Sequence, residues 1–455
     1  MRFSQRLIRP LRRLPHGRVI RLSPPEILLL GFVALSAIGT LLLLLPIAAY
    51  DPLLWHQALF TATSAVTVTG LSVIDVSGLR LFGQFVVLGL IQLGGLGFMT
   101  FTALTLVLLG MRLPLQQQNL IRESLHHTSF RELMRLVRMV IVFSLLTEAL
   151  GMLLLAIAWV PEHGLWWGLW VSLFHAISAF NGAGFTLWPD SLTDSVDDPL
   201  VSNVVSILII IGGLGFVVIA ELREKIAGRG KLSLHARIML HATLWLILIP
   251  MAAILLLEWN NPATLGGLES TGVRLQAAWF QAITPRSGGL STMDTASLTD
   301  PTTLLTMLLM FIGAGPGSAA SGIKVTTFVV LLLVARAFFR GNAQPTAFGR
   351  SISEETVLKA VAVALAGTLL VFTCLFILTL TEPGKDFLDL AFEAVSAFGT
   401  VGLSRGITDE ISLPGQLTLI VTMLLGRAGP ISLGYFIATR QSHGLKYAQG
   451  QVHIG

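Results

Sequence analysis

Long apolar runs alternate with short basic stretches along the whole chain. Eight of these runs have the roughly 20 apolar residues that a helix needs to cross a bilayer. They fall into four that leave one side of the membrane and four that return: 26–49, 136–160, 238–258 and 357–380 outgoing; 82–110, 200–220, 302–339 and 414–438 returning. The pattern predicts an all-α integral membrane protein with eight transmembrane helices.

The positions of lysine and arginine predict the orientation of these helices. Most of the 30 basic residues lie in five segments, which are the stretch up to Arg21, residues 112–138, 223–237 and 336–359, and the tail from Arg440. Basic residues near membrane spans favour the cytoplasmic side. We therefore expect all five segments, and with them both termini, to be cytoplasmic.

Composition narrows the class further. Only 12% of the residues are charged, about half the usual share in a soluble domain. The single cysteine, Cys374, cannot form a disulfide within the chain, and the ten histidines show no metal-ligand spacing. The net charge of +5 is explained by anionic membrane lipid, and we expect no nucleic-acid partner.

The segments between outgoing and returning runs resemble one another. Each starts with Phe, has Ala two positions later, then Ser or Thr, then Gly followed by Leu or Phe, and finally Asp. They read FTATSAVTVTGLSVID from 60, FHAISAFNGAGFTLWPD from 174, FQAITPRSGGLSTMD from 280 and FEAVSAFGTVGLSRGITD from 392. A glycine-rich motif also recurs in the returning runs, as LGGLGF at 93–98, IGGLGF at 211–216, IGAGPG at 312–317 and LGRAGP at 425–430.

Two motifs that recur four times in step predict four repeats. We expect each repeat to hold an outgoing helix, a short pore helix with a loop, and a returning helix, placed with pseudo-fourfold symmetry around a central pore. The predicted division is a basic cytoplasmic tail 1–25, repeats 26–111, 112–222, 223–345 and 346–440, and a cytoplasmic tail 441–455.

Irregular backbone at membrane depth is tolerated only inside protein or beside a water-filled cavity. Carbonyls of the glycine-containing loops can then replace the hydration shell of a hard monovalent cation. The predicted selectivity filter, with K⁺ at its backbone carbonyls, consists of Thr67, Val68, Thr69, Gly70, Asn181, Gly182, Ala183, Gly184, Ser287, Gly288, Gly289, Gly399, Thr400, Val401 and Gly402.

An aspartate follows every loop. Four carboxylates around one outer mouth would concentrate cations there. The other interpretation is that they are ordinary loop acids or caps of the next helix. The residues are Asp75, Asp190, Asp294 and Asp409.

These motifs resemble the Trk/Ktr/HKT superfamily of potassium transporters over nearly the whole chain. The resemblance rests on TVTGLS at 67–72, GSAASGIKVTTF at 317–328, SAFGTVGLS at 396–404 and GRAGP at 426–430. It implies K⁺ uptake across the bacterial cytoplasmic (inner) membrane, often Na⁺-dependent, and repeats similar to potassium-channel subunits. It also implies a homodimer on a cytosolic RCK-type (KtrA-like) ring that binds ATP and ADP. The segments 221–237 and 440–455 are candidate docking faces, or simply basic segments that face water and lipid.

The four filter loops differ from one another, which predicts one good cation site and moderate discrimination of K⁺ from Na⁺. In plant members of the superfamily, serine at the first filter glycine accompanies Na⁺ transport, so glycine in all four repeats favours K⁺. A Na⁺-permeable or non-selective monovalent cation transporter of the same superfamily is the alternative.

The third returning run contains four glycines and a proline within ten residues, which cannot sustain a regular helix. We expect two half-helices joined by a flexible loop, 313–324, below the filter. The resemblance implies that this loop is an intramembrane gate; the alternative is a hinge that only packs helices and has no gating role. Arg427, at the position of Gly95, Gly213 and Ala314 in the other repeats, is expected to reach the pore beside it, or else to form an ion pair between helices. The predicted gate residues are Gly313, Gly315, Pro316, Gly317, Ser318, Gly322, Lys324 and Arg427.

Three further charges lie in apolar surroundings. Glu393 is expected to hydrogen-bond the backbone of a pore loop rather than to coordinate an ion. Arg286 is expected to point away from the filter and pair with a carboxylate, and Glu148 has no partner that the sequence identifies. An enzyme is disfavoured, because no nucleophile–base pair recurs within the membrane and His175 stands alone. A two-repeat organic-solute transporter fits less well than a four-repeat pore.

Overall fold

The computed structural model describes residues 12–13, 19–20, 24–108, 130–228, 230–342 and 344–429, with side chains within 26–100, 137–228, 230–342 and 344–429. Most of the predicted tail 1–25, most of the basic segment 112–138 and all of the tail 441–455 lie outside these residues. The predicted repeat boundaries therefore stay predictions.

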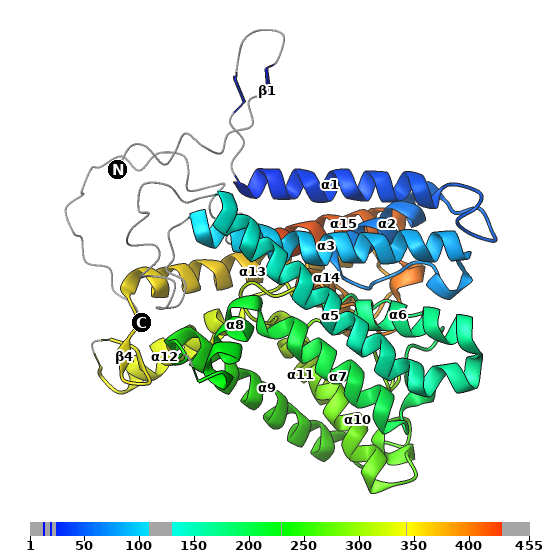
Figure 1. The fold of residues 1–455 in the computed structure, drawn as a ribbon. Helices are drawn as coiled ribbons and strands as arrows, with labels where there is room; N and C mark the ends of the chain where they lie inside the picture. The colour runs from blue at the N-terminus through cyan, green and yellow to red at the C-terminus, as the bar shows by residue number, and fades with distance from the viewer. Residues whose placement is uncertain are drawn as a thin grey trace.

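Long and short helices alternate along the described chain (Figure 1). A long helix begins each of four successive stretches of the chain: α1 (Pro24–Leu43), α5 (Phe130–His163), α9 (Leu234–Glu258) and α13 (Glu354–Thr381). Each is followed by a short helix: α2 (Trp55–Thr67), α6 (Leu165–Asn181), α10 (Thr271–Ile283) and α14 (Phe387–Gly399). The chain then returns in α3 (Leu81–Leu108), in α7 (Pro199–Leu214) with α8 (Phe216–Ile226), in α11 (Asp300–Phe311) with α12 (Val325–Phe339), and in α15 (Leu413–Ala428).

Extended structure is confined to two small hairpins in the described chain. Strand β1 (Arg12–Arg13) pairs with β2 (Val19–Ile20), and β3 (Thr346–Ala347) pairs with β4 (Arg350–Ser351), both antiparallel. Single 3₁₀ turns occupy connections: η2 (Val76–Gly78), η3 (Thr193–Ser195), η4 (Leu265–Gly267) and η5 (Thr408–Glu410). The predicted mostly helical class is confirmed.

Five described helices are long and apolar enough to cross a membrane, and the bent pair α7–α8 makes a sixth candidate span. The predicted runs 302–339 and 414–438 correspond to shorter apolar helices, α11, α12 and α15, within the described residues. A multi-pass membrane protein is therefore indicated.

Local sequence fixes where several of these helices begin. The side chains of Ser233, Ser353 and Ser412 accept hydrogen bonds from backbone N–H groups at the starts of α9, α13 and α15. Asp198 does the same for α7, where Pro199 takes the first position. Each cap satisfies a donor that the first turn would otherwise leave unpaired.

The short helices connect helices that are distant in the sequence. Besides its own long helix, α6 packs against α3, α10 against α7, α14 against α11, and α2 against α15. Each short helix thus touches the returning helix that precedes it, and the contact between α2 and α15 closes the set from the last stretch to the first. The largest cluster of buried apolar side chains lies around α2, α3, α6 and α7.

Candidate functional site

The loops that follow the short helices share one unusual backbone pattern. Two residues in each loop, separated by one other, have positive φ between 45° and 96°: Val68 and Gly70, Gly182 and Gly184, Ser287 and Gly289, Thr400 and Gly402. Positive φ is natural for glycine but costs other L-residues about 1–2 kcal/mol. The strain at Val68, Ser287 and Thr400 marks a geometry that the surrounding structure imposes.

The second residue of each pair, always glycine, lies against the backbone of a neighbouring loop. A methyl group added to any of these glycines would meet backbone atoms of a neighbouring loop. The distance from the added carbon is 2.4 Å to Ala183 O at Gly70, 3.0 Å to Gly289 Cα at Gly184, 2.1 Å to Val401 O at Gly289, and 2.4 Å to Thr69 O at Gly402. No side chain fits between loops at such distances. The four predicted filter segments therefore converge, with peptide groups at their meeting point.

A buried hydroxyl from each short helix holds its loop in place. Ser64 Oγ accepts from Gly70 N at 3.0 Å and Ser396 Oγ accepts from Gly402 N at 3.2 Å. In the other two loops the hydroxyl donates, from Ser178 to Phe185 O at 2.6 Å and from Thr284 to Leu290 O. The sequence contained the signal, a Ser or Thr four residues after each Phe, but this supporting role was not assigned from it.

The hydroxyls of the first loop are engaged within that loop. Thr67 Oγ1 donates to Thr63 O at 2.7 Å and lies 2.7 Å from Thr69 Oγ1, and neither threonine is exposed. These bonds fix the orientation of both hydroxyls inside the loop.

The second loop is supported by a buried triangle of polar side chains. Gln92 Nε2 donates to Glu148 at 2.8 Å, while Asn181 Nδ2 donates to Glu148 at 3.1 Å and to Gln92 Oε1 at 3.0 Å. Glu148 is only 2% exposed. Glu148, whose partner the sequence did not reveal, therefore bonds the predicted filter residue Asn181. The three side chains join α3, α5 and α6 at one point.

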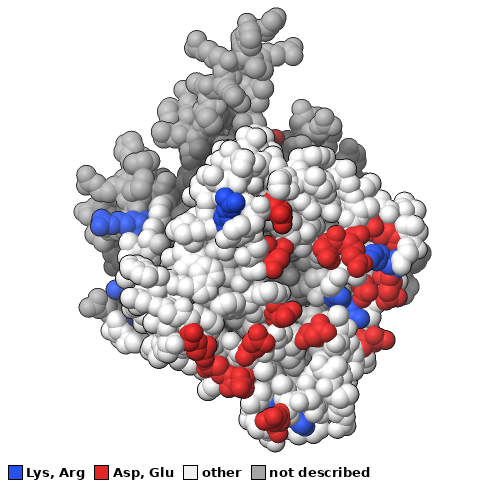
Figure 2. All heavy atoms as spheres, turned by 90° about the vertical axis from the view of Figure 1, so that its right-hand side faces the viewer, with Lys and Arg blue, Asp and Glu red and all other residues white. Residues whose placement is uncertain are grey.

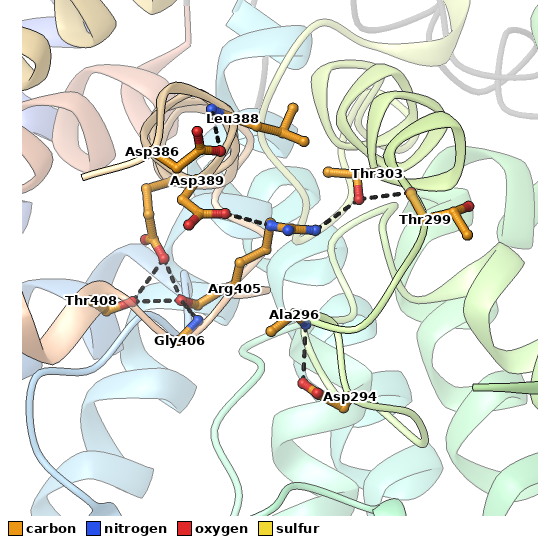
Figure 3. A network of polar contacts seen from close by, with 12 residues as sticks. Asp294, Ala296, Thr299, Thr303, Asp386, Leu388, Asp389, Arg405, Gly406 and Thr408 are labelled. Atoms are coloured by element: carbon orange, nitrogen blue, oxygen red, sulfur yellow. Dashed lines mark hydrogen bonds and ion pairs between the residues drawn. The ribbon is translucent and has the colours of Figure 1, made fainter. Parts of the chain in front are cut away.

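Figure 3 shows the corresponding support behind the fourth loop. The carboxylate of Glu393, which is fully buried, accepts from the hydroxyls of Ser404 and of Thr408, the latter at 2.9 Å. Beside it, Arg405 donates to Asp389 at 2.6 Å and to Thr303 Oγ1 of α11 at 2.9 Å. Glu393 thus bonds side-chain hydroxyls of the segment that follows the predicted filter residues, and not the loop backbone as expected. Arg405 ties that segment to α11.

The contacts of Arg286, directly before Ser287, differ from the expected ion pair. Among the described residues it pairs with no carboxylate, and its guanidinium donates to Thr243 O of α9 at 3.3 Å. The prediction of an ion pair was therefore wrong within the described residues. Arg286 lines a small cavity with Asn181, Ser287 and the loop residues Ala319 and Ala320, so the filter and the loop below it adjoin.

The segment between α11 and α12 is an ordered, buried loop. Gly313 N donates to Ile323 O at 2.9 Å and Ile323 N donates to Phe311 O at 3.2 Å, which closes the base of the loop. Gly315 N donates to Gly213 O of α7 at 2.9 Å. Ser318, with Pro316 and Gly317 beside it, donates to Gly315 O at 2.6 Å. The predicted half-helices and connecting loop are thus present, and the loop is anchored to the neighbouring repeat.

Arg427 reaches this loop from α15. Its fully buried guanidinium donates to Ala319 O, contacts Ser321 Oγ at 3.5 Å, and donates to Gly94 O of α3 at 3.2 Å. It lies 4.8 Å from the ring centre of Phe98. None of the ion pairs in the described part of the chain involves Arg427, so the alternative of an ion pair between helices was wrong there.

Lys324 is a second cation at the same place. Its Nζ donates to Ala320 O at 2.5 Å and lies 5.6 Å from the ring centre of Phe98. Two basic side chains, those of Arg427 and Lys324, therefore bond carbonyls of the same loop.

The four aspartates after the loops are all exposed. Asp75 accepts from Ser77 N at 2.8 Å and Asp294 accepts from Ala296 N at 3.0 Å, so these two cap turns, as one of the two interpretations expected. Asp190 and Asp409 have no such side-chain bond among the described residues. Figure 2 views the end at which α1 and α5 finish, and acidic side chains outnumber basic ones there.

Known proteins are similar to this chain in fold and in sequence. A crystal structure of the potassium transporter TrkH from Vibrio parahaemolyticus superimposes with a TM-score of 0.75 over 94% of this chain and 87% of that one, at 19% identity. The two proteins thus share a fold. Residues 26–442 match the TrkH cation transport protein family, and the chain belongs to that family.

Relatives cover almost the full chain. It is 44% identical to the Ktr system potassium uptake protein B of Bacillus subtilis over 96% of this chain and 98% of that protein. It is 41% identical to the protein of the same name from Vibrio alginolyticus, over 95% of both. It is 34% identical to the potassium/sodium uptake protein NtpJ of Enterococcus hirae, over 96% of this chain and 98% of that one. The predicted likeness to the Trk/Ktr/HKT superfamily, and to its KtrB members, is confirmed.

Proposed function

We propose that this protein takes up K⁺ across the bacterial cytoplasmic membrane through one pore whose narrowest part is formed by the four loops. One observation carries the proposal: loops with the same pair of left-handed residues meet at Gly70, Gly184, Gly289 and Gly402. Carbonyls arranged around one line replace the hydration shell of an alkali cation. The names of the Bacillus and Vibrio relatives support K⁺ as the cargo.

The proposed pore has pseudo-fourfold symmetry and eight spanning segments. The closed succession of contacts between short and returning helices supports it, since every repeat meets its neighbour in the same way. In this arrangement α7 with α8, and α11 with α12, each count as one interrupted span.

The loop 313–324, with Arg427 and Lys324, is proposed as the gate. We interpret this arrangement as closed, because Arg427 and Lys324 bond carbonyls of the buried loop, and the loop residues Ala319 and Ala320 line the small cavity beside the predicted filter. Opening then requires the loop to leave Arg427. The exposed aspartates at the outer end are proposed to raise the local cation concentration, in addition to the turns that two of them cap.

Na⁺ enters the proposal in two ways. The resemblance to Ktr systems supports Na⁺-dependent K⁺ uptake, and the name of the Enterococcus relative supports Na⁺ as a second permeant ion. The observation that favours the latter is the unlike sequence of the four loops, which gives unequal coordination from the four sides.

For the assembly, we propose a homodimer on a cytosolic RCK-type subunit that binds ATP and ADP, with both termini cytoplasmic. The likeness to Ktr membrane subunits supports this assembly. The exposed basic residues at the end of α8, Arg223 and Lys225, make segment 221–237 the candidate docking face in the described chain.

Growth and flux measurements test the function. The chain should rescue an uptake-deficient bacterium at low K⁺ and carry Rb⁺ into proteoliposomes. Gly70→Ser, at a packed glycine with φ of 96°, should lose K⁺ preference or all transport. The control is Gly78→Ser, because no atom lies within 4 Å of the position that its β-carbon would take. Rescue by Gly70→Ser equal to that by Gly78→Ser would contradict the filter assignment.

A further inference from the structure

A large apolar cavity lies where α7 bends by 101° into α8. Its volume is about 330 Å³, and side chains from α3, α5, α6, α7 and α8 line it. Nearly all are apolar, such as Met99, Phe143 and Ile211. The bend at Gly215 creates this space, because α8 leaves the line of α7 and no longer packs along α5.

The cavity opens toward lipid in the described part of the chain. On its rim, Val142 is 45% exposed and Leu146 is 65% exposed, and both belong to the membrane-spanning helix α5. At this depth the surrounding medium is hydrocarbon, not water. An empty apolar space loses dispersion contacts on every wall, so a flexible hydrocarbon chain is the natural occupant.

Charge defines which lipid suits the site. Among the described lining residues, Arg223 is the charged one, and it lies near the end of α8 where the basic segment 223–237 begins. Arg138, next to the lining residue Met139 on α5, is also exposed. Neither arginine takes part in an ion pair within the described residues. Arg223 at the cavity, with Arg138 adjacent in sequence to the lining residue Met139, fits an anionic headgroup whose acyl chain lies inside.

The inner wall of the cavity connects to the gate and the filter. Phe216 N donates to Gly317 O at 3.4 Å, and a methyl group on Gly317 would lie 2.8 Å from the ring of Phe216. Phe180, another lining residue, directly precedes the filter residue Asn181. An occupant that presses on Phe216 therefore acts on the loop through one contact.

We propose that this cavity binds an acyl chain of an anionic phospholipid of the cytoplasmic leaflet, with its headgroup at Arg223 and Arg138. The bound chain holds Phe216 against Gly317 and so favours the closed loop. The binding site is independent of what the pore carries, whereas the effect on the gate rests on the proposed function.

Binding is tested on the purified full-length protein by native mass spectrometry with phosphatidylglycerol and phosphatidylcholine. Arg223→Gln should lower the preference for phosphatidylglycerol about fivefold, the ~1 kcal/mol that a basic residue gains at an anionic surface. Lys225→Gln, an exposed residue of α8 that does not line the cavity, should keep it. Ala220→Phe should fill the cavity and reduce bound lipid, whereas Ala252→Phe, exposed on α9, should not. Equal lipid binding by each variant and its control would overturn the site, as would a second copy of the chain covering the cavity.

Gating is tested separately by Rb⁺ flux in vesicles with and without phosphatidylglycerol. Anionic lipid should lower basal flux through the wild type and not through Ala220→Phe. Normal lipid binding with lipid-independent flux would refute the effect on the gate alone. Normal lipid binding without any flux under any condition would refute the proposed function and leave the lipid site standing.

Discussion

Replacing Arg427 with alanine is expected to open the pore. The guanidinium of Arg427, which projects from α15, donates to Ala319 O of the proposed gating loop and to Gly94 O of α3, so it holds the loop to both helices. A hydrogen bond to a charged group contributes about 1.5–3 kcal/mol. Loss of the bond to the loop alone would shift the equilibrium between closed and open loops roughly 10- to 150-fold toward open.

The assay is Rb⁺ uptake into proteoliposomes that contain the protein without a regulatory subunit. Basal flux through Arg427→Ala should rise by a factor within that range until the open form dominates. Arg427→Met is the matched variant, because it keeps most of the side-chain volume and loses the hydrogen bonds. Similar flux through the Met and Ala variants would assign the closure to the bonds, whereas flux through the Met variant near the wild-type level would assign it to bulk.

The thermal unfolding temperature and the size-exclusion profile of each variant show whether a change in flux comes from gating or from loss of the fold. The reasoning is refuted if a folded Arg427→Ala protein shows wild-type flux and an unchanged response to the regulatory subunit. In that case Arg427 would hold helices together without a role in the ion path.

Three further predictions follow from the same contacts. Gly289→Ala should abolish flux while Gly184→Ala only reduces it, since the nearest atom to the added methyl lies at 2.1 Å in the first case and 3.0 Å in the second; equal losses in uptake would count against the packing argument. Glu148→Leu should lower the ratio of Rb⁺ to Na⁺ flux, and it should lower the free energy of unfolding by about 1–3 kcal/mol for each donor left unpaired. Glu148→Gln should have smaller effects, and identical flux ratios for the two variants would show that Glu148 does not act on the filter. Deletion of residues 314–321 should give a leaky pore that ignores regulation, and a tightly regulated deletion protein would argue against the gate.

Recurrence made much of this site predictable. Four copies of one motif located the loops and their glycines without any structure, because backbone that must adopt positive φ leaves a visible requirement for glycine at Gly70, Gly184, Gly289 and Gly402. The interrupted third returning helix was predictable for a similar reason, since glycine and proline act locally on the backbone.

Features that depend on distant contacts were not predictable. The motifs LGGLGF at 93–98 and IGGLGF at 211–216 are nearly identical, yet α3 continues through the first and α7 ends before Gly215 in the second. The difference lies in the neighbour: Gly215, with φ of 84°, packs against the loop at Pro316. Likewise Glu148 finds its partners on α3 and α6, which no local pattern reveals, and Arg286 bonds a carbonyl of α9.

An experimental density map of the protein in K⁺, with Rb⁺ or Tl⁺ as an electron-dense substitute, tests the central claim most directly. The account predicts an ion peak on the line between Gly70, Gly184, Gly289 and Gly402, within coordination distance of carbonyl oxygens from all four loops. Loops that fail to converge, or a meeting point filled by side chains with no ion, would contradict it.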